Sequence, residues 1–312
     1  MFPESTEVIQ MNIFDVIIIG RGPAGLQAAI YTARSGLSTL VLGRNDGALA
    51  KADRIENYFG FSEPVSGRAL LEAGTIQASN FGARILDENV LSLEISAIEP
   101  GCFDVTCGND IFVGRSVLLA VGKALPRLKK EGLKELEGSG ISYCATCDGF
   151  LYKKMKLGVL GAGEYALHEA EALRNFTRDV TIYTDGGTLY EEIEEIMKSE
   201  GFAIDTRKVK GFEGKEVYGD TVLGKILFED GSSDDIDGMF IAHERPSSAD
   251  FAMKLGFATT DKGSIVVDEK MATSVPGVYA AGDCCSSFKQ IATAVGQGCL
   301  ASESIISDIK KA

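Results

Sequence analysis

Two glycine-rich turns, each preceded by a run of apolar residues, constrain the fold of this chain most strongly. The first turn, residues 20–25, follows the apolar run 14–19, and the second turn, residues 161–163, follows the run 157–160. Such runs are typical of strands buried on both faces, and the apolar spacing after each turn is helical. The sequence therefore predicts an α/β fold with two strand–turn–helix domains of similar, Rossmann-like design.

The first turn carries the residues that a dinucleotide site needs. Gly20 permits the tight turn, Gly22 lets the backbone approach phosphates, and Gly25 lets the following helix lie close to the sheet. The N–H groups at the start of that helix can bind a pyrophosphate. We therefore expect a dinucleotide here, and the alternative is a plain strand-to-helix turn.

The surroundings of the second turn do not favour a bound dinucleotide. Glu164 brings a carboxylate to the position where a pyrophosphate would lie. The next expected strand, 180–183, ends in Thr184-Asp185-Gly186, where a 2′-phosphate would require arginines, and the first arginine beyond it is Arg207. The backbone design is repeated, whereas the phosphate-binding chemistry is not.

The domain boundaries follow from the last part of the chain. After a break near residues 242–248, the expected strand 277–283 and an apolar helix follow without a glycine turn of their own. This tail is short for an independent domain, so we expect it to complete the first domain. The prediction is a discontinuous outer domain, 11–126 with 246–312, and an inserted domain, 127–245, with the polar stretch 123–138 as a linker.

A pair of cysteines lies in the segment Cys144-Ala145-Thr146-Cys147-Asp148-Gly149. Two cysteines separated by two residues can close a small reversible disulfide, and in a reducing compartment CxxC indicates a redox pair. The alternatives are a buried apolar pair or half of a metal site. With no second CxxC and no paired histidines to supply further ligands, we expect no metal. A dinucleotide beside a dithiol suggests electron transfer between them.

The other five cysteines carry less information. Cys284 and Cys285 are adjacent, and a redox pair is one interpretation, but small-residue filling at a strand end is the favoured one. Cys102, Cys107 and Cys299 are interpreted as ordinary apolar residues.

The charge of the chain excludes some classes of partner. Its formal net charge of −14 argues against nucleic acid and against an anionic membrane surface. No apolar run approaches the roughly 18–20 residues that span a bilayer, and the first ten residues lack a basic segment, so we expect a cytoplasmic protein. Basic residues nevertheless flank the CxxC, either as a solvated face or as a docking patch for an acidic partner: Lys123, Arg127, Lys129, Lys130 and Lys134 before it, and Lys153, Lys154 and Lys156 after it.

Several motifs together resemble the low-molecular-weight flavin thioredoxin reductases over nearly the whole chain. They are the first glycine turn, the segment 56–61, the CATCDG segment 144–149, the second glycine turn, and the Gly282-Asp283 strand end with Gln290. The resemblance implies a homodimer that binds FAD and reduces thioredoxin, with a domain rotation about hinges near 123–127 and 242–246. The implied FAD contacts are Gly20, Gly22, Pro23, Ala24, Gly25, Gly43, Asn57, Val90, Gly122, Gly282, Asp283, Gln290, Ile291 and Ala292.

The resemblance also assigns roles at the cysteine pair. It implies a Cys144–Cys147 disulfide in which Cys147 faces the flavin and Cys144 attacks the disulfide of thioredoxin. Asp148 is the implied proton donor or acceptor beside them. These three residues are the predicted catalytic residues.

Departures from the family pattern bear on the electron donor. The family has a basic HRR-type strand end where this chain has 184–186, a GHxPN segment where it has 243–247, and Gly-Gln-Leu-Thr where it has 47–50. A carboxylate in place of phosphate-binding cations repels NADPH. The combination resembles the ferredoxin-dependent flavin thioredoxin reductases, which is the predicted function, although ferredoxins are usually acidic and the net charge of the chain opposes their approach.

Three alternatives stay open at this stage. An NADH- or NADPH-dependent thioredoxin reductase is the first, because Asp185 stands where an acidic residue can bind an adenosine ribose. A flavin dithiol oxidase that passes electrons to oxygen is the second. The third is a flavoprotein that senses redox state without turnover.

Overall fold

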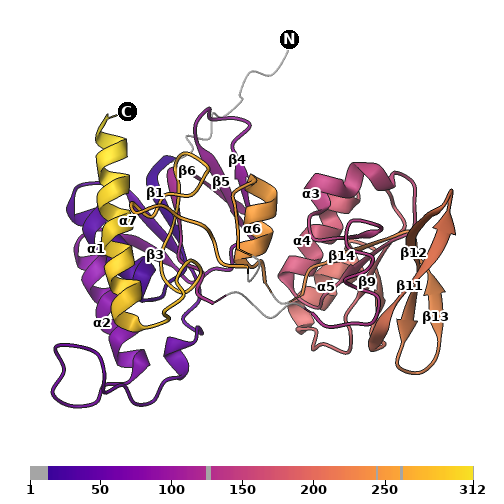
Figure 1. The fold of residues 1–312 in the computed structure, drawn as a ribbon, viewed down its shortest axis with the longest axis horizontal. Helices are drawn as coiled ribbons and strands as arrows, with labels where there is room; N and C mark the ends of the chain where they lie inside the picture. The colour runs from indigo at the N-terminus through magenta and orange to yellow at the C-terminus, as the bar shows by residue number, and fades with distance from the viewer. Residues whose placement is uncertain (1–12, 124–127, 244, 261–262, 312) are drawn as a thin grey trace, which may run out of the picture. The chain divides into compact units, whose positions relative to one another are not determined.

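A computed structural model describes residues 13–123, 128–243, 245–260 and 263–311 (Figure 1). Contacts within the chain divide it into two compact units. The first comprises Met1–Ala124 with Leu255–Ala312, and the second comprises Leu125–Lys254. The first unit is therefore discontinuous in sequence.

A seven-stranded sheet forms the centre of the first unit, with the order β3-β2-β1-β6-β5-β4 and with β15 paired to β6. β1 is parallel to both β2 and β6, and Ile18 is in register with Val41 on one side and Leu118 on the other. The sheet's strands are β1 (Ile13–Ile19), β2 (Thr39–Leu42), β3 (Arg84–Leu86), β4 (Ser92–Ile95), β5 (Phe103–Cys107), β6 (Asp110–Leu119) and β15 (Val278–Ala280).

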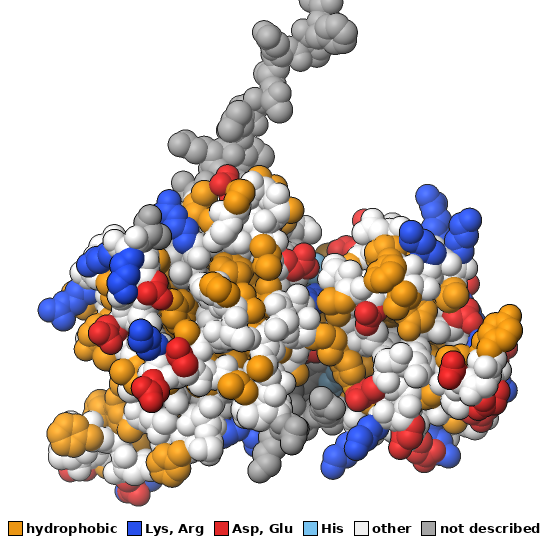
Figure 2. All heavy atoms as spheres, turned by 45° about the horizontal axis from the view of Figure 1, so that its top comes forward, with side chains coloured by type: hydrophobic (Ala, Val, Ile, Leu, Met, Phe, Trp, Pro, Cys, Tyr) orange, Lys and Arg blue, Asp and Glu red, His pale blue; other side chains and the backbone are white. Residues whose placement is uncertain are grey.

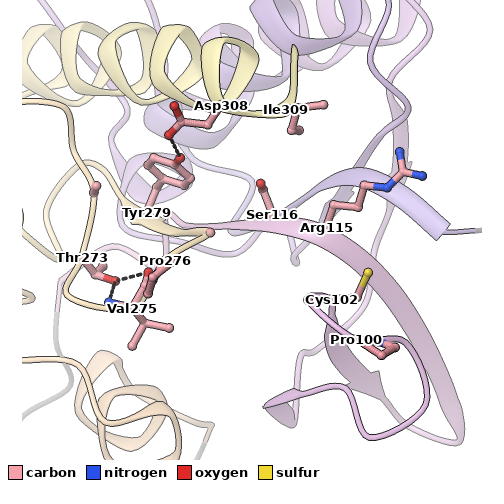
Figure 3. A pocket seen from close by; sticks show the side chains of 13 residues that line it. Pro100, Cys102, Arg115, Ser116, Thr273, Val275, Pro276, Tyr279, Asp308 and Ile309 are labelled. Atoms are coloured by element: carbon pink, nitrogen blue, oxygen red, sulfur yellow. Dashed lines mark hydrogen bonds between the residues drawn. The ribbon is translucent and has the colours of Figure 1, made fainter. Parts of the chain in front are cut away.

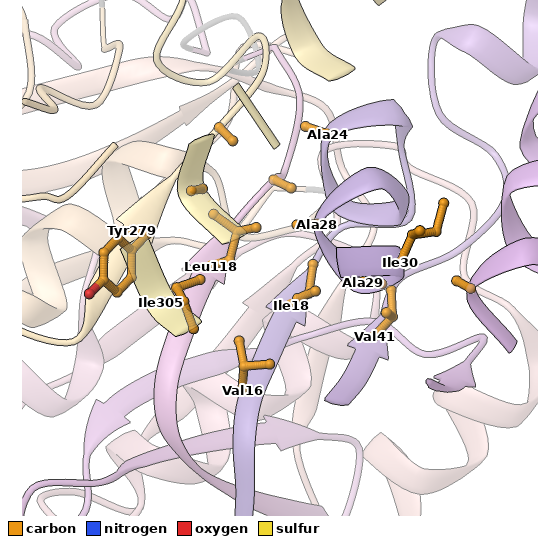
Figure 4. Packing of buried hydrophobic residues seen from close by; sticks show 14 of the residues in the cluster. Val16, Ile18, Ala24, Ala28, Ala29, Ile30, Val41, Leu118, Tyr279 and Ile305 are labelled. Carbon is orange, nitrogen blue, oxygen red and sulfur yellow. The ribbon is translucent and has the colours of Figure 1, made fainter. Parts of the chain in front are cut away.

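Helices α1 (Pro23–Arg34) and α7 (Ile291–Lys311) pack on this sheet, and α2 (Gly67–Asn80) packs on α1. Figure 4 shows Val16, Ile18 and Leu118 from the strands beside Ala28 of α1 and Ile305 of α7. All five side chains are inaccessible to solvent. The first and the last helix of the unit therefore share one core, which is why the end of the chain belongs with its beginning.

The second unit has a parallel sheet of five short strands in the order β10-β9-β8-β14-β7. Its strands are β7 (Ile141–Ser142), β8 (Leu157–Leu160), β9 (Val180–Tyr183), β10 (Ala203–Asp205) and β14 (Gly238–Ile241). A three-stranded antiparallel sheet adjoins it, made of β11 (Val209–Val217), β12 (Asp220–Phe228) and β13 (Ser233–Asp235). The helices are α3 (Ala145–Asp148), α4 (Glu164–Leu173), α5 (Glu191–Ser199) and α6 (Ser248–Leu255), with short 3-10 turns at Leu49–Lys51 in the first unit and Gly149–Tyr152 in the second. The predicted α/β fold with two Rossmann-like domains is confirmed.

Two features of the chain's organisation differ from expectation. The polar stretch 123–138 is only partly a connection, because Leu133 and Leu136 are buried in the core of the second unit with Phe212 and Leu223. Two residues separate the two leucines, and both reach the same hydrophobic cluster despite the charged residues around them. The second division of the chain falls after Lys254, before the last residue of α6, whereas the sequence places it near residue 246.

Among the described residues, no helix has the length and apolar character needed to cross a membrane.

Candidate active site

The cysteine pair lies at the start of α3, directly after β7. Cys144 and Cys147 form a disulfide, with their Cα atoms 5.3 Å apart. Cys144 precedes the helix as its N-cap, and the N–H of Cys147 donates to the Cys144 sulfur at 3.1 Å. Cys144 is 0% exposed, whereas Cys147 is only partly buried. The two cysteines therefore differ in exposure, and Cys147 is the more accessible of the two.

Asp148 is held beside the disulfide by a buried serine. The Ser142 hydroxyl donates to Oδ2 of Asp148 at 2.6 Å, and the N–H of Cys144 donates to the same hydroxyl oxygen at 3.2 Å. Tyr152 lies near the carboxylate, and burial followed by the Asp148 charge raises the pKa of its phenol. The structure thus brings the three predicted catalytic residues together on one short segment.

The first glycine turn connects β1 to α1 in the first unit. Gly20 has a φ of 117°, and a Cβ there would lie 2.1 Å from the Ala120 carbonyl oxygen. A Cβ at Gly25 would lie 2.0 Å from the Gly20 oxygen, so both glycines are required by close backbone contact. Gly22 is different, because a Cβ there would meet nothing within 4 Å. It faces open space at the start of α1, beside Pro23 and Ala24.

Other predicted FAD residues gather at the same edge of the sheet. A Cβ on Gly43, after β2, would lie 2.9 Å from the Arg21 nitrogen, and one on Gly282, after β15, would lie 3.1 Å from Cβ of Ala24. Gly122 follows β6 in the left-handed conformation, with a φ of 75°. These strands are parallel, so their carboxyl ends meet at one edge of the sheet. This glycine edge comprises Gly20, Gly22, Gly25, Gly43, Gly122 and Gly282.

Loops from distant parts of the sequence complete this edge. The Asn57 side-chain amide donates to Oε1 of Gln290 at 3.2 Å, across 233 residues of sequence. Gln290 directly precedes α7, whose first residues are Ile291 and Ala292. Asp283 follows Gly282 in the turn after β15, and Val90 is buried on the segment that leaves β3.

In the second unit, the second glycine turn connects β8 to α4. A Cβ on Gly161 would lie 2.1 Å from the Ala242 carbonyl oxygen, the same kind of close contact as at Gly20. Here, however, the first turn of the helix contains Glu164, whereas the first turn of α1 contains no acidic residue. The turn after β9 lies close to the second glycine turn, because a Cβ on Gly187 would lie 3.0 Å from Cβ of Ala162.

Asp185, at the end of β9, is engaged by the protein itself. Nζ of Lys130 lies 2.7 Å from Oδ2 and 2.9 Å from Oδ1 of Asp185, and the N–H of Val209 donates to Oδ1 at 2.7 Å. The side chains of Lys130 and Asp185 are only 15% and 12% exposed. Arg207 is engaged as well, since it pairs with Asp205 and Asp234 and lies over the ring of Phe228.

Comparison with known proteins places this geometry in a family. Residues 14–298 match the model of the pyridine nucleotide-disulphide oxidoreductases. The chain belongs to this family. It is 37% identical to a thioredoxin reductase of Aquifex aeolicus, with 96% of this chain and 95% of that protein covered.

Two solved structures show the same fold along the chain. The atypical thioredoxin reductase TRi from Desulfovibrio vulgaris Hildenborough has a TM-score of 0.88 and 39% identity, with coverage of 96% of this chain and 98% of that chain. A ferredoxin-flavin thioredoxin reductase from Clostridium acetobutylicum has a TM-score of 0.71 and 28% identity, with coverage of 97% and 100%.

The basic residues around the disulfide of this oxidoreductase are not all exposed surface charges. Lys130 is committed to Asp185, and Arg127 lies outside the described residues. Lys153 and Lys154 are exposed directly after the disulfide segment, and the same stretch exposes three apolar side chains. Those three are Phe150, Leu151 and Met155. Figure 2 shows basic and hydrophobic side chains next to one another on the second unit.

The remaining cysteines of the oxidoreductase fit the interpretation as small apolar residues in most cases. Cys102, Cys107 and Cys284 are buried, and Cys285 and Cys299 are partly buried. The Cys284 thiol donates to the carbonyl oxygens of Leu119 and Ala281. A hydrogen bond with the Cys285 sulfur and burial raise the pKa of Cys284, which makes it a poor nucleophile.

A pocket of 720 Å³ lies in the first unit (Figure 3), and none of its lining residues is a predicted FAD contact. Arg115 and Ser116 of β6 and Asp308 of α7 are among its lining residues, and the Tyr279 hydroxyl donates to Asp308 at 2.6 Å. None of these four residues was predicted as a site residue from the sequence. Tyr279 and Asp308 are paired with each other, Arg115 forms an ion pair with Asp15, and no predicted catalytic residue lines the pocket.

Proposed function

We propose that the protein is a flavin thioredoxin reductase that receives electrons from reduced ferredoxin. The disulfide beside Asp148 supports the reductase activity, and the engagement of Asp185 by Lys130 is the observation that carries the choice of donor. Relatives along the whole chain are named thioredoxin reductases, and one similar structure is a ferredoxin-flavin thioredoxin reductase. A homodimer in the cytoplasm is part of the same proposal.

The glycine edge of the first unit fits FAD. Gly22 leaves open space at a helix start that has neither an acidic residue nor a side-chain cap, so the N–H groups there are available to phosphate oxygens. Gly20 and Gly25 bring the turn close to the sheet, and Asp283 and the start of α7 adjoin the same edge. When bound, FAD supplies a group that accepts electrons singly and delivers them in pairs.

The cysteine pair performs the exchange with thioredoxin. Reduction gives two thiols, and the thiolate form of Cys144 is the nucleophile that attacks the disulfide of thioredoxin through a mixed disulfide. The N–H of Cys147 points at the Cys144 sulfur and stabilises that thiolate. Asp148, oriented by Ser142, holds or releases the accompanying proton.

Exchange with a protein partner requires access that this structure does not give to Cys144. Because Cys144 is 0% exposed, the segment must move before it meets thioredoxin. One dithiol cannot face the flavin and a protein substrate at once, so a rotation of the second unit about the connections near 123–127 and 242–246 is part of the same proposal. Residues 124–127 and 244 of these connections lie outside the described residues.

Nicotinamide dinucleotides are disfavoured as donors by the second unit's own residues. Both oxygens of Asp185 already bind Lys130 or the N–H of Val209, so the carboxylate is not available to a ribose diol. Glu164 adds negative charge at the glycine turn, and Arg207 is paired with two aspartates instead of a 2′-phosphate. Ferredoxin needs no such nucleotide site.

The exposed segment after the disulfide is the proposed docking surface for acidic protein partners. It combines the apolar side chains of Phe150, Leu151 and Met155 with the charges of Lys153 and Lys154. Apolar contacts stabilise a docked partner, while the lysines attract it against a chain whose net charge is −14.

The test follows the flavin absorbance anaerobically while NADPH, NADH and reduced ferredoxin are added separately, with thioredoxin as the acceptor. Bleaching by ferredoxin alone, followed by thioredoxin reduction, supports the proposal. Rapid bleaching by either nicotinamide dinucleotide contradicts the choice of donor. A separate aerobic assay with a small dithiol tests the alternative, because rapid consumption of oxygen without thioredoxin reduction indicates a dithiol oxidase instead.

A further inference from the structure

A buried carboxylate lies directly behind the disulfide segment. Glu169, on α4, is 1% exposed, and its Oε2 accepts the backbone N–H of Ala145 at 2.7 Å. Its other oxygen, Oε1, lies 2.9 Å from Nζ of Lys254, whose side chain is 3% exposed. All three residues belong to the second unit. The carboxylate thus connects a buried cation to the residue that follows Cys144.

The bond to Ala145 completes the hold on the backbone of Cys144. Ser142 accepts the N–H of Cys144 itself, and Glu169 accepts the next N–H along the chain. At a helix start these N–H groups have no partner within the helix, and burying them unpaired is costly. α3 has only four residues, so it is too short to fix this geometry alone.

The surroundings of Glu169 explain why it is paired. Asp250 and Tyr165 lie close enough that the Glu169 charge helps to raise the pKa of each, after the larger effect of burial. Asp250 accepts the N–H of Ser247 at 2.6 Å, at the start of α6. Lys254 offsets the negative charge that Glu169 brings to this interior. A buried ion pair contributes little net stability, so a positional role accounts for it better.

We propose that Glu169 is a positioning residue for the redox disulfide and that Lys254 keeps it available as a hydrogen-bond acceptor. The inference rests on the proposed role of Cys144 and Cys147 as a redox pair. A fixed Cys144 backbone keeps the two sulfurs in bonding geometry, so less conformational entropy is lost when the disulfide forms. Removing the acceptor at Ala145 therefore shifts the equilibrium towards the dithiol.

The experiment measures this equilibrium in the full-length, flavin-loaded protein with dithiothreitol redox buffers. Dithiothreitol supplies two electrons and two protons. The Cys144–Cys147 bond breaks and two S–H bonds form, while dithiothreitol closes its own disulfide ring. Acid quenching, thiol alkylation and mass spectrometry give the fraction of each form. Neither ferredoxin nor thioredoxin takes part.

Two double variants isolate the acceptor from the charge. Glu169→Gln with Lys254→Met removes both charges but keeps an amide oxygen for Ala145, whereas Glu169→Leu with Lys254→Met removes the acceptor as well. We expect the first to stay within about twofold of the parent equilibrium. We expect the second to favour the dithiol about tenfold, which corresponds to about 30 mV for two electrons. Flavin content and melting temperature provide the control for folding.

Equal equilibria in the two double variants would overturn the inference, as would a tenfold shift in the glutamine variant. If the leucine variant does not fold, Glu169→Asp retains the charge and withdraws the oxygen, and the same tenfold shift is expected from it. A parent protein that titrates normally yet fails to couple ferredoxin to thioredoxin would contradict the proposed function alone.

Discussion

Lys130 and Asp185 form an ion pair at the end of β9, with Nζ of the lysine 2.7 Å from Oδ2 of the aspartate. The pair connects the segment before the disulfide to the strand end where related folds recognise an adenosine ribose. Asp185, which the sequence allowed as a contact for NADH, is thus bound by a lysine of the protein itself.

The first prediction concerns this pair. Asp185→Asn retains an oxygen for the Val209 N–H and tolerates the positive φ of 54° at this position, but it loses the charge opposite Lys130. We expect the free energy of unfolding to fall by about 2–4 kcal/mol, because a largely buried lysine loses its partner. Denaturant titration measures this. In the Asp185→Asn variant, the further substitution Lys130→Met should lower the free energy of unfolding only a little more. If the losses from the two substitutions add fully, Lys130 and Asp185 do not share an interaction.

The second prediction concerns the cysteines. Cys144→Ser and Cys147→Ser should each reduce thioredoxin reduction to background, because a single thiol cannot form or release the disulfide. Bound flavin should be retained, since the glycine edge belongs to the other unit. Steady-state assays and absorbance spectra measure the two properties. Turnover that persists in both single variants would contradict the assigned role of the pair.

The third prediction tests the FAD site through Gly22. Its φ is −87°, and nothing lies within 4 Å of an added Cβ, so Gly22→Ala should leave the stability of the apoprotein unchanged. It should weaken FAD binding at least about tenfold, or about 1.4 kcal/mol, because the methyl group enters the proposed phosphate site. Gly296→Ala, also in open space but within α7, is the matched control. Unchanged flavin affinity in Gly22→Ala would place the cofactor elsewhere.

The fourth prediction concerns Lys153 and Lys154. Reversing both to glutamate should slow flavin reduction by ferredoxin roughly tenfold at low salt, because long-range attraction to an acidic partner is lost. High salt should reduce the difference. The effect on thioredoxin reduction should be smaller, since apolar contacts contribute more to the docking of thioredoxin than to the docking of ferredoxin. Reversal of the exposed Lys210 and Lys225 on the three-stranded sheet is the charge-matched control, and equal effects from both pairs would count against a local patch.

The fifth prediction concerns pH and the stability of the second unit. Hydrogen bonds from Arg207 lower the pKa of Asp205 below 3.8. Between the lowered value and 3.8 the unfolded chain binds a proton that the folded chain does not, so folding stability rises with pH in this window and is lost as pH falls through it. Arg207→Met should therefore reduce the melting temperature near neutral pH, and its difference from the parent should shrink below pH 4. A pH-independent difference would mean that packing on Phe228 dominates instead.

Much of the fold could be predicted because its signals are local. The apolar run before Gly20 and the helical spacing after Gly25 lie within one short segment, and the same pattern recurs at Gly161. The strand 180–183 was predicted for the same reason. The return of the last part of the chain to the first domain was inferred instead from its shortness and from the lack of a glycine turn of its own. The CxxC spacing likewise indicated a redox pair, and Cys144 and Cys147 form a disulfide in the structure.

What escaped prediction depends on contacts between distant segments. Lys130 was grouped with surface lysines, yet its partner is far along the chain on β9. Leu133 and Leu136 lie among charged residues, so only the folded core explains their burial. Glu169 is an ordinary residue on an amphipathic helix until the fold brings it to Ala145. The sequence places the second division near residue 246 and the contacts place it after Lys254, because nothing in residues 246–254 indicates the unit with which α6 packs.

The unequal burial of the two sulfurs has a consequence for inhibitor chemistry. In the oxidised protein a nucleophilic thiol probe can approach Cys147, while Cys144 offers it no accessible surface. Attack of the probe on the Cys147 sulfur breaks the Cys144–Cys147 bond, forms a mixed disulfide at Cys147 and releases Cys144 as the thiolate. Electrophilic compounds react with a thiolate and not with the disulfide, so they must be screened against the reduced protein.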